Sequence, residues 1–452
     1  MSRIQNLNDL LRNGRGQTRA VALSCLDAAL DAADTYKGTK RVVHRQGDRL
    51  TVGDQTFDLA DLGDIYVVGA GKGSYPIAQA LDEILGDDIK QGFVMVKETG
   101  RPALEHIEVI VSGHPVPNPA SLEGGLLLEK LAVGLGPNDL VFAAMTGGCS
   151  ALMALPVPGV TLEDKIAVNR LLLRTGARIG EMNAVRKHLS LLKGGGLIKL
   201  LQPATVVTLT QDTAPDSLPW PDPSLPDPST FADAMSMLKY YEIWDQMPQS
   251  VRDHLEKGLT DPGLETPKSF EGWRTYMYDT GNQRDACLAA VAKAREMGYQ
   301  GAVLSTKLEG ESRELGIMLA GIAKEIQLYG RPFTAPFVLA SAGESTVTVR
   351  GQGKGGPNME TVLGFARYIE GYPGVALASI DSEGTDGPTD LAGGLADDLT
   401  LARSRELSLD LKGLLKENDS LIGLEALGDA VITGATGTNV VNLRVLVVDK
   451  RE

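Results

Sequence analysis

The chain has few cysteines, a deficit of positive charge and no long apolar stretch. Cys25, Cys149 and Cys287 lie far apart with no CxxC pair, so the sequence indicates neither a disulfide scaffold nor a zinc site. Its 44 Lys and Arg stand against 58 Asp and Glu, which gives a formal net charge of −14. Because attraction to phosphate polymers needs a basic field, nucleic acid and anionic membrane surfaces are disfavoured as partners.

Features of membrane or secreted proteins are also lacking. No stretch approaches the roughly 20 apolar residues that a membrane-spanning helix needs. The first residues, "MSRIQNLNDLLRNGRGQTRA", are polar and lack the apolar run of a signal peptide. We therefore expect a cytoplasmic protein with no membrane partner.

Short β-branched runs alternate with longer helical ones along the chain. Runs such as "DIYVVGAG" and "DLVFAAMTGG" are typical of buried strands, and "YPIAQALDEIL" is typical of a helix. In a second set, "QRDACLAAVAKAREMGY" and "SRELGIMLAGIAKEIQLYG" predict helices, and strands are expected in "GAVLSTK", "PFVLASAG", "STVTVRG", "VALASID" and "VITGA". This alternation predicts an α/β fold, with helices on both faces of a parallel or mixed sheet.

The length of 452 residues is too great for one core and predicts two or three domains. We place a boundary near the proline-rich segment 213–231, which gives a Rossmann-like N-terminal domain at 1–230 and a C-terminal α/β domain at 231–452. Prolines resist both helix and sheet, so this segment is a linker, a rigid surface loop or a loop over an active-site cleft.

Two glycine-rich segments follow predicted strands of the first set. In "VVGAGKGS", residues 67–74, Gly71, Gly73 and Ser74 could bring backbone N–H groups close to an anion, and Lys72 adds a positive charge. The alternative is a plain tight turn, since the segment is neither a Walker loop nor a complete GxGxxG. In "MTGGCSALMALPVPG", the residues Gly147, Gly148 and Ser150 form a second candidate anion site.

Two further segments of the first set carry polar side chains. His114 lies in the loop "SGHPVPNPAS", where it is either a structural histidine or part of a site. The segment 161–196 reads as one helix, which carries Asn183, Arg186, Lys187 and Lys193 near its end and finishes in three glycines. A solvated basic helix end is the simple interpretation, and the glycines favour an anion site.

The second set adds glycines and acids. Glu344 precedes a glycine-rich loop with Lys354, and "SIDSEGTDGPTD", residues 379–390, gathers Asp386 with three other acids. Such oxygen ligands suit Mg²⁺, although an acidic turn would look the same. Thr438 and Asn439 offer polar contacts after a strand. Glycine nests with lysines and an acidic cluster are together what phosphoryl transfer needs.

The chain resembles the glycerate 2-kinase family with a MOFRL-type C-terminal domain, whose members were often named hydroxypyruvate reductases. From about residue 18 to about residue 448, the resemblance is carried by "GAGKGS", "GHPVPNPAS", "TGGCSAL", "TLEDK", "NAVRKHLSLLKGGG", "PDPSTFADA", "GESTVTVRGQGKGG", "GTDGPTD" and "TGTNV". It implies two three-layer α/β/α domains with the active site in the cleft between them. It further implies phosphorylation of D-glycerate to 2-phosphoglycerate with ATP and Mg²⁺ as cofactors.

Carried over position by position, the resemblance implies Lys72, Arg186 and Lys193 as catalytic residues. The implied metal ligands are Glu344, Asp386 and Asp212. From the residues themselves and from the resemblance together, we predict that the contacts to the hydroxy-acid substrate and to phosphate are Gly71, Gly73, Ser74, His114, Gly147, Gly148, Ser150, Asn183, Lys187, Lys354, Gly355, Gly356, Asn358, Thr438 and Asn439.

The chain departs from the family pattern at two of these places, because Pro357 and Gly196 stand where the resemblance implies arginines. Two other functions therefore stay open. One is a reductase of hydroxypyruvate, for which Glu98 is a weak candidate ribose ligand. The other is a catalytically altered member that binds a small anion. A homo-oligomer is compatible with the sequence.

Overall fold

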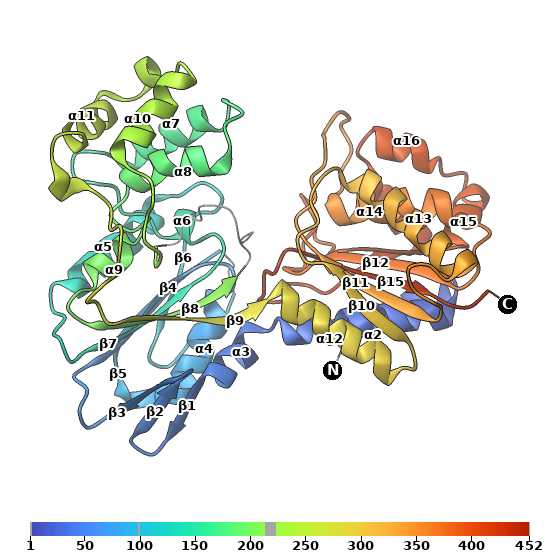
Figure 1. Cartoon of the computed structure of the whole chain (residues 1–452), viewed down its shortest axis with the longest axis horizontal. Helices are drawn as coiled ribbons and strands as arrows, with labels where there is room; N and C mark the ends of the chain where they lie inside the picture. The colour runs from blue at the N-terminus through green and yellow to red at the C-terminus, as the bar shows by residue number, and fades with distance from the viewer. Residues whose placement is uncertain (1, 98–99, 213–222, 452) are drawn as a thin grey trace. The chain divides into compact units, whose positions relative to one another are not determined.

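The computed structural model describes residues 2–97, 100–212 and 223–451. The chain forms two compact units, a central unit of residues 35–280 and a terminal unit that joins residues 1–34 to residues 281–452 (Figure 1). These ranges do not coincide with the predicted domains 1–230 and 231–452. The chain after residue 231 still completes the core and sheet of the central unit, and the first helices pack on the terminal sheet.

The central unit is built on a six-stranded sheet with the order β6-β5-β4-β7-β8-β9. Neighbouring strands from β6 to β8 are parallel, and β4 and β7 are buried at every position, as expected for a sheet covered on both faces. The strand order reverses between β4 and β7, as in Rossmann-like sheets. The strands are β4 (Ile65–Ala70), β5 (Ile89–Val96), β6 (Glu108–Val111), β7 (Leu140–Met145), β8 (Thr205–Asp212) and β9 (Thr275–Asn282).

Alternate residues of these strands enter two apolar layers. On one face, Val67 and Phe142 pack with α4 and with the antiparallel strands β1 to β3. On the other, Val68 and Val141 pack with α5, α6 and α9. The elements of these layers are α3 (Thr35–Val42), β1 (Val43–Gln46), β2 (Arg49–Val52), β3 (Gln55–Asp58), α4 (Ser74–Leu85), α5 (Pro119–Ala132), α6 (Cys149–Leu152) and α9 (Gly196–Leu200).

Four further helices of the central unit share an apolar core of their own, and Figure 1 shows them grouped together beyond the sheet. They are α7 (Leu162–Leu172), α8 (Ile179–His188), α10 (Phe231–Tyr240) and α11 (Gln249–Gly258). The prediction of one helix over 161–196 is wrong. Gly176 takes a φ of +71° between α7 and α8, and the side chain of Glu181 accepts the Arg178 N–H at the start of α8.

The terminal unit contains a mixed six-stranded sheet with the order β10-β11-β15-β12-β13-β14. Helices α2 and α12 cover one face and α13 and α14 cover the other, so both units are three-layer α/β and the predicted fold class is confirmed. The strands are β10 (Gln300–Ser305), β11 (Phe337–Ala342), β12 (Val375–Asp381), β13 (Gly393–Asp397), β14 (Ala430–Val431) and β15 (Asn442–Val448). The helices are α1 (Leu7–Arg12), α2 (Gly16–Ala32), α12 (Gln283–Glu296), α13 (Ser312–Tyr329), α14 (Pro357–Ile369), α15 (Thr400–Glu406), α16 (Leu411–Lys416) and α17 (Ser420–Leu427).

Two strands expected in this unit are not formed as predicted. The segment "STVTVRG" is an extended loop with one bridge, between Thr346 and Glu311, because the N–H groups of Arg350 and Gly351 donate to the Asn418 side chain. Of "VITGA", only the first residue, Val431, belongs to a strand. Within the described ranges, no helix has the length and apolarity needed to cross a membrane.

A buried ion cluster attaches the N-terminal helices to the terminal unit. The Arg19 Nε lies 2.6 Å from Asp397 Oδ2, its Nη1 lies 2.8 Å from Asp429 Oδ1, and all three side chains are fully buried. The same Nη1 also donates to the Leu10 carbonyl at 3.0 Å. One guanidinium therefore joins α2 to the ends of β13 and β14 and to α1.

We expect Arg19→Met to lower the free energy of unfolding by about 3–5 kcal/mol, because it leaves the buried Asp397 without a counter-charge and leaves Asp429 with Arg403 alone. Urea unfolding followed by circular dichroism measures this loss. Arg12→Met is the matched control, since Arg12 and Asp9 form an exposed pair whose removal costs at most about 0.5 kcal/mol. Equal losses in the two variants would contradict the structural role of Arg19.

Candidate functional site

The turn between β4 and α4 is fastened to the end of β7. The Gly73 N–H donates to Thr146 Oγ1 at 2.9 Å, and the Lys72 N–H donates to the Gly147 carbonyl at 2.8 Å. Gly71 has a φ of +144°, and a Cβ at this position would lie 2.1 Å from Thr146 Oγ1. Glycine is therefore required at position 71 for the two strand ends to meet. In sheets of this order, ligands bind beside such a meeting point.

Ser74 has a structural role at this turn. Its hydroxyl is buried, donates to the Ala144 carbonyl at 2.8 Å and lies 3.1 Å from Thr146 Oγ1. The side chain that was predicted to contact phosphate thus ties the start of α4 to β7.

Three loops bring Lys72, His114 and Gly148 together. Gly148 has a φ of +91°, and a Cβ at this position would lie 3.1 Å from the His114 ring and 3.5 Å from Lys72 Cγ. These residues follow β4, β6 and β7, so the carboxyl ends of three parallel strands of one sheet supply them, with β5 lying between β6 and β4. Two glycine turns and His114, which are separate candidates in the sequence, thus lie close together in the central unit.

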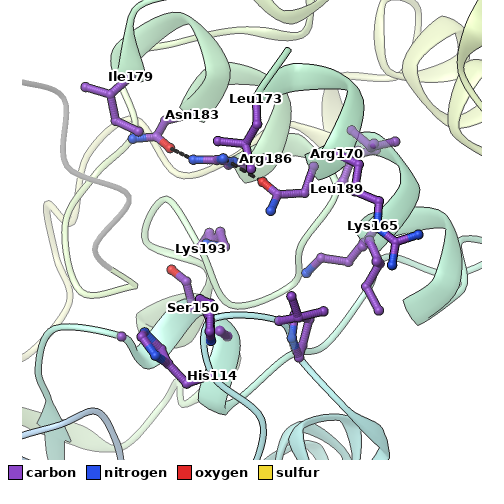
Figure 2. Close-up of a pocket in the computed structure, with 18 residues that line it drawn as sticks. His114, Ser150, Lys165, Arg170, Leu173, Ile179, Asn183, Arg186, Leu189 and Lys193 are labelled. Carbon is purple, nitrogen blue, oxygen red and sulfur yellow. Dashed lines mark hydrogen bonds between the residues drawn. The ribbon is translucent and has the colours of Figure 1, made fainter. Parts of the chain in front are cut away.

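A cavity of about 380 Å³ begins beside His114 and Gly148. Figure 2 shows Lys193 in its middle, with His114 and Ser150 on one side and Arg186 and Asn183 on the other. The lining residues are His114, Pro115, Val116, Pro117, Gly148, Ser150, Ala151, Lys165, Ile166, Val168, Asn169, Arg170, Leu173, Ile179, Asn183, Arg186, Leu189 and Lys193. This lining contains four cations and no carboxylate, so the cavity suits an anionic ligand.

The basic residues of this cavity differ in exposure, since Lys193 is buried and Arg186 is half-buried, whereas Arg170 is exposed. Burial, together with the nearby charges of Arg186 and Lys187, lowers the pKa of Lys193 to about 8. Burial also lowers the pKa of Arg186, whose guanidinium donates to the neutral Asn169 Oδ1 at 2.5 Å and to Asn183 Oδ1 at 3.3 Å. The two amides fix the plane of the guanidinium without neutralising it, which leaves its charge available to a ligand.

The sequence analysis missed Lys165, which is on α7 and lines the same cavity. Its Nζ is buried and has no hydrogen-bond partner. Burial, together with the charge of Lys193, lowers the pKa of Lys165 to about 7. The motif "TLEDK" contains this lysine, but helical spacing alone does not show which side chain is desolvated.

Lys187 does not line the cavity. Its Nζ lies 2.9 Å from Asp227 Oδ1, and both side chains are almost completely buried. Burial opposes ionisation of Asp227, but its hydrogen bonds with Lys187 and Ser229 hold the pKa of this carboxyl below its ordinary value. Lys187 thus forms a structural ion pair, whereas its neighbour Arg186 faces the cavity.

The triple glycine shapes the backbone after α8. Gly194 and Gly195 have φ values of +59° and +81°. A Cβ at Gly196 would lie 2.2 Å from the Leu191 carbonyl oxygen. In this backbone, glycine at position 196 is a packing requirement.

The glycine-rich loop of the terminal unit uses its donors internally. The N–H groups of Arg350, Gly351, Gly353 and Lys354 donate to Asn418 Oδ1, to the Glu417 carbonyl and to Asp419 Oδ1 at 2.7–3.1 Å. A Cβ at Gly355 would lie 2.0 Å from Ser420 Oγ, and one at Gly356 would lie 2.3 Å from Asp386 Cγ. The glycines here allow close packing, and Lys354 is exposed.

Asp386 and Asn358 form a buried network in the same unit. Asp386 accepts bonds from the Asn358 backbone N–H at 3.1 Å, from the Asn358 Nδ2 at 2.9 Å and from the Met359 N–H at 2.8 Å. Burial raises the pKa of Asp386 to about 6. Its carboxylate caps the start of α14, which does not fit direct coordination of a metal ion.

The other predicted metal ligands are Glu344 and Asp212. Glu344 is exposed, and the side chain of Asp212 lies outside what the structure describes, as does Glu98. Among the described residues, no group of three or more His, Cys, Asp or Glu side chains is arranged to hold a metal ion. Thr438 donates to the Ala33 carbonyl at 2.6 Å and Asn439 to Glu383 Oε2 at 3.1 Å, both within the terminal unit.

Comparison with known proteins extends over nearly the whole chain. Residues 21–256 match the family described as "Domain of unknown function (DUF4147)", and residues 337–442 match the MOFRL family. Glycerate 2-kinase of Pyrococcus horikoshii is 36% identical over 436 residues, which are 96% of this chain and 98% of that protein. D-glycerate 2-kinase of Thermotoga maritima is 36% identical over 86% of this chain and 92% of its own length. A crystal structure of glycerate kinase from Thermotoga maritima has a TM-score of 0.85 at 32% identity and covers 96% of this chain and 100% of its own.

We expect Gly148→Ala to weaken binding of anionic ligands, because its methyl group would press on the His114 ring and touch the side chain of Lys72. The positive φ adds a backbone cost of about 1–2 kcal/mol. Gly159→Ala is the matched control, since Gly159 has a φ of +89° and no atoms near its missing Cβ. Both variants should lose thermal stability, and calorimetric titration with ATP and with D-glycerate should detect weaker binding in Gly148→Ala alone. Unchanged binding in this variant would contradict the convergence of the three loops.

Proposed function

Because the chain belongs to the glycerate kinase family, we propose that it phosphorylates D-glycerate with ATP and Mg²⁺ and releases 2-phosphoglycerate. The observation that carries the proposal is the cationic cavity beside the strand-order reversal of the central sheet. Kinase catalysis depends mainly on positioning and on neutralising the charge of the transferred group. A cavity lined by cations and free of carboxylates supports this chemistry.

Arg186 and Lys193 are proposed to bind and orient the anionic groups. The guanidinium of Arg186 is held in one plane by Asn169 and Asn183 and presents a fixed set of donors to a carboxylate or phosphate. Lys193 adds a compact charge from the middle of the cavity. Because Lys193 is buried and Arg186 is half-buried, their attraction to an anion is stronger than at a fully exposed surface.

Lys72 is proposed to act at the His114 side of the cavity. Its backbone is fixed by the bond to the Gly147 carbonyl, and the start of its side chain lies near Gly148. This placement lets its ammonium stabilise negative charge on the transferred phosphoryl group. ATP supplies that group, and the phosphates of the nucleotide together with water are the expected ligands of Mg²⁺, since Asp386 does not fit this role.

The test is ADP release from ATP and Mg²⁺ with D-glycerate, D-lactate and a panel of four-carbon hydroxy acids. ³¹P NMR of the product distinguishes 2-phosphoglycerate from 3-phosphoglycerate. Absence of acid-stimulated ADP release across the panel would refute the proposal. Consumption of NADH with hydroxypyruvate in the same preparation would assign the reductase activity instead.

We expect Arg186→Met to lower kcat by about 10²-fold to 10³-fold, because it removes a preorganised donor set from the cavity. Arg174→Met is the control, since Arg174 is an exposed cation on the turn after α7 and is not part of the cavity. The control variant should keep the wild-type rate. Equal rates in all three proteins would exclude Arg186 from the reaction.

Substitution by arginine should affect stability differently at the two positions that depart from the family pattern, Pro357 and Gly196. Pro357 is the first residue of α14, a position that tolerates most residues, so Pro357→Arg should fold with a loss of about 1 kcal/mol or less. Its added guanidinium should raise the rate of ADP release. Gly196→Arg should lower the melting temperature much further, because its Cβ would meet the Leu191 carbonyl. Scanning calorimetry with the ADP assay measures both effects, and similar melting temperatures would contradict the packing at Gly196.

A further inference from the structure

We propose that Lys165 binds the anionic group of the ligand in the cavity and takes up a proton from solvent as the ligand enters. The inference rests on the proposed function for the identity of the ligand, a phosphate or carboxylate anion. It extends that function by naming a binding residue and a proton that accompanies binding. The proton adds to the lone pair of Nζ, and no other bond changes.

The first argument is the contrast between two buried lysines of the central unit. Lys187 has Asp227 as its counter-charge at 2.9 Å, as buried lysines normally require. Lys165 has no hydrogen-bond partner at Nζ, yet its side chain lines a cavity of about 380 Å³. A buried polar group that lacks a partner inside the protein is expected to find one in a ligand.

The second argument is the charge around Lys165. The charged or titratable groups that line the cavity with it are Arg170 on the same helix, Arg186 from α8, Lys193 from the segment before α9 and His114 from the loop after β6. The neighbouring Asp164 is held by Thr161 and Ser250 and does not line the cavity. Without a ligand, every charged neighbour in the lining therefore opposes protonation of Lys165. An anion among these cations reverses that effect.

The direction of the pH effect follows from the pKa of Lys165. Burial lowers this pKa to about 7, against 10.5 for an ordinary lysine, so above neutral pH the empty cavity holds mainly the uncharged amine. A ligand that requires the ammonium form must then recruit a proton. If Lys165 alone titrated, affinity would be about tenfold weaker at pH 8 than at pH 6.

The test is isothermal titration calorimetry of the full chain with ATP in one arm and D-glycerate in the other. Titrations at pH 8 in Tris and in HEPES, which differ in ionisation enthalpy, give the number of protons taken up. The wild type should take up a fraction of one proton with at least one probe, and that probe identifies the anion that Lys165 holds. The Lys165→Met variant should bind this probe more weakly and take up fewer protons on binding. Lys165→Arg should restore binding without the uptake, because arginine is already charged.

Thermal unfolding of the unliganded variants separates this role from a structural one. Lys165→Met should raise the melting temperature at pH 7, because it replaces a buried amine that has no hydrogen-bond partner at Nζ with an apolar side chain of similar length. Lys187→Met should lower the melting temperature, because it leaves Asp227 without its counter-charge. The wild type should itself gain stability from Lys165 as pH rises from about 7 towards 10.5, since unfolding takes up a proton in that range.

Proton uptake that is equal in the wild type and Lys165→Met, or no uptake with either probe, would overturn the inference. So would a loss of stability in unliganded Lys165→Met as large as that in Lys187→Met. These measurements do not require turnover. A chain that releases no ADP but takes up a proton through Lys165 would refute the proposed kinase activity and support this inference.

Discussion

The hydroxyl of Thr146 holds the candidate site together. It accepts the Gly73 N–H at 2.9 Å and lies 3.1 Å from the Ser74 hydroxyl, so the end of β7 and the turn after β4 become one rigid piece. A rigid junction at the strand-order reversal fixes where the following loops begin. Lys72 and Gly148 follow the two strands that meet at this junction, and the loop after β6 brings His114 to them. The precision of the site therefore comes from the sheet and not from the loops themselves.

The distribution of counter-charges separates structural lysines and arginines from those of the site. Arg19 and Lys187 are buried against carboxylates, whereas Arg186 contacts only amides and Lys165 has no hydrogen-bond partner at Nζ. Desolvated cations without carboxylates destabilise the unliganded fold. A desolvation cost of this kind is retained where function needs the charges. Because Arg186 and Lys165 both line the cavity, this cost is a physical reason to place ligand binding there.

Local sequence pattern predicted most of the strands and the class of the fold, because buried parallel strands carry continuous apolar runs. It predicted the glycine turns after β4 and β7, since glycine and strand boundaries are both visible in the sequence. The pattern could not distinguish the roles of Arg186 and Lys187, which are adjacent on one helix. Arg186 faces the cavity, whereas Lys187 faces the buried Asp227. The pattern missed Lys165, because desolvation is a property of the assembled helices. The sequence likewise could not show that the N–H donors of the glycine-rich loop before α14 are taken by the distant residues 417–419.

The terminal unit is assembled from the two ends of the sequence, and this arrangement has a consequence for folding during biosynthesis. The central unit is one uninterrupted segment, and all of its residues have left the ribosome before the last strands of the terminal unit are translated. Helix α2, by contrast, emerges among the first residues but buries its apolar face against strands as late as β15. Arg19 in particular waits for Asp429, some four hundred residues later, to complete its ion pair. The apolar face of α2 and the charge of Arg19 therefore gain their partners only when the last strands of the terminal unit have been made.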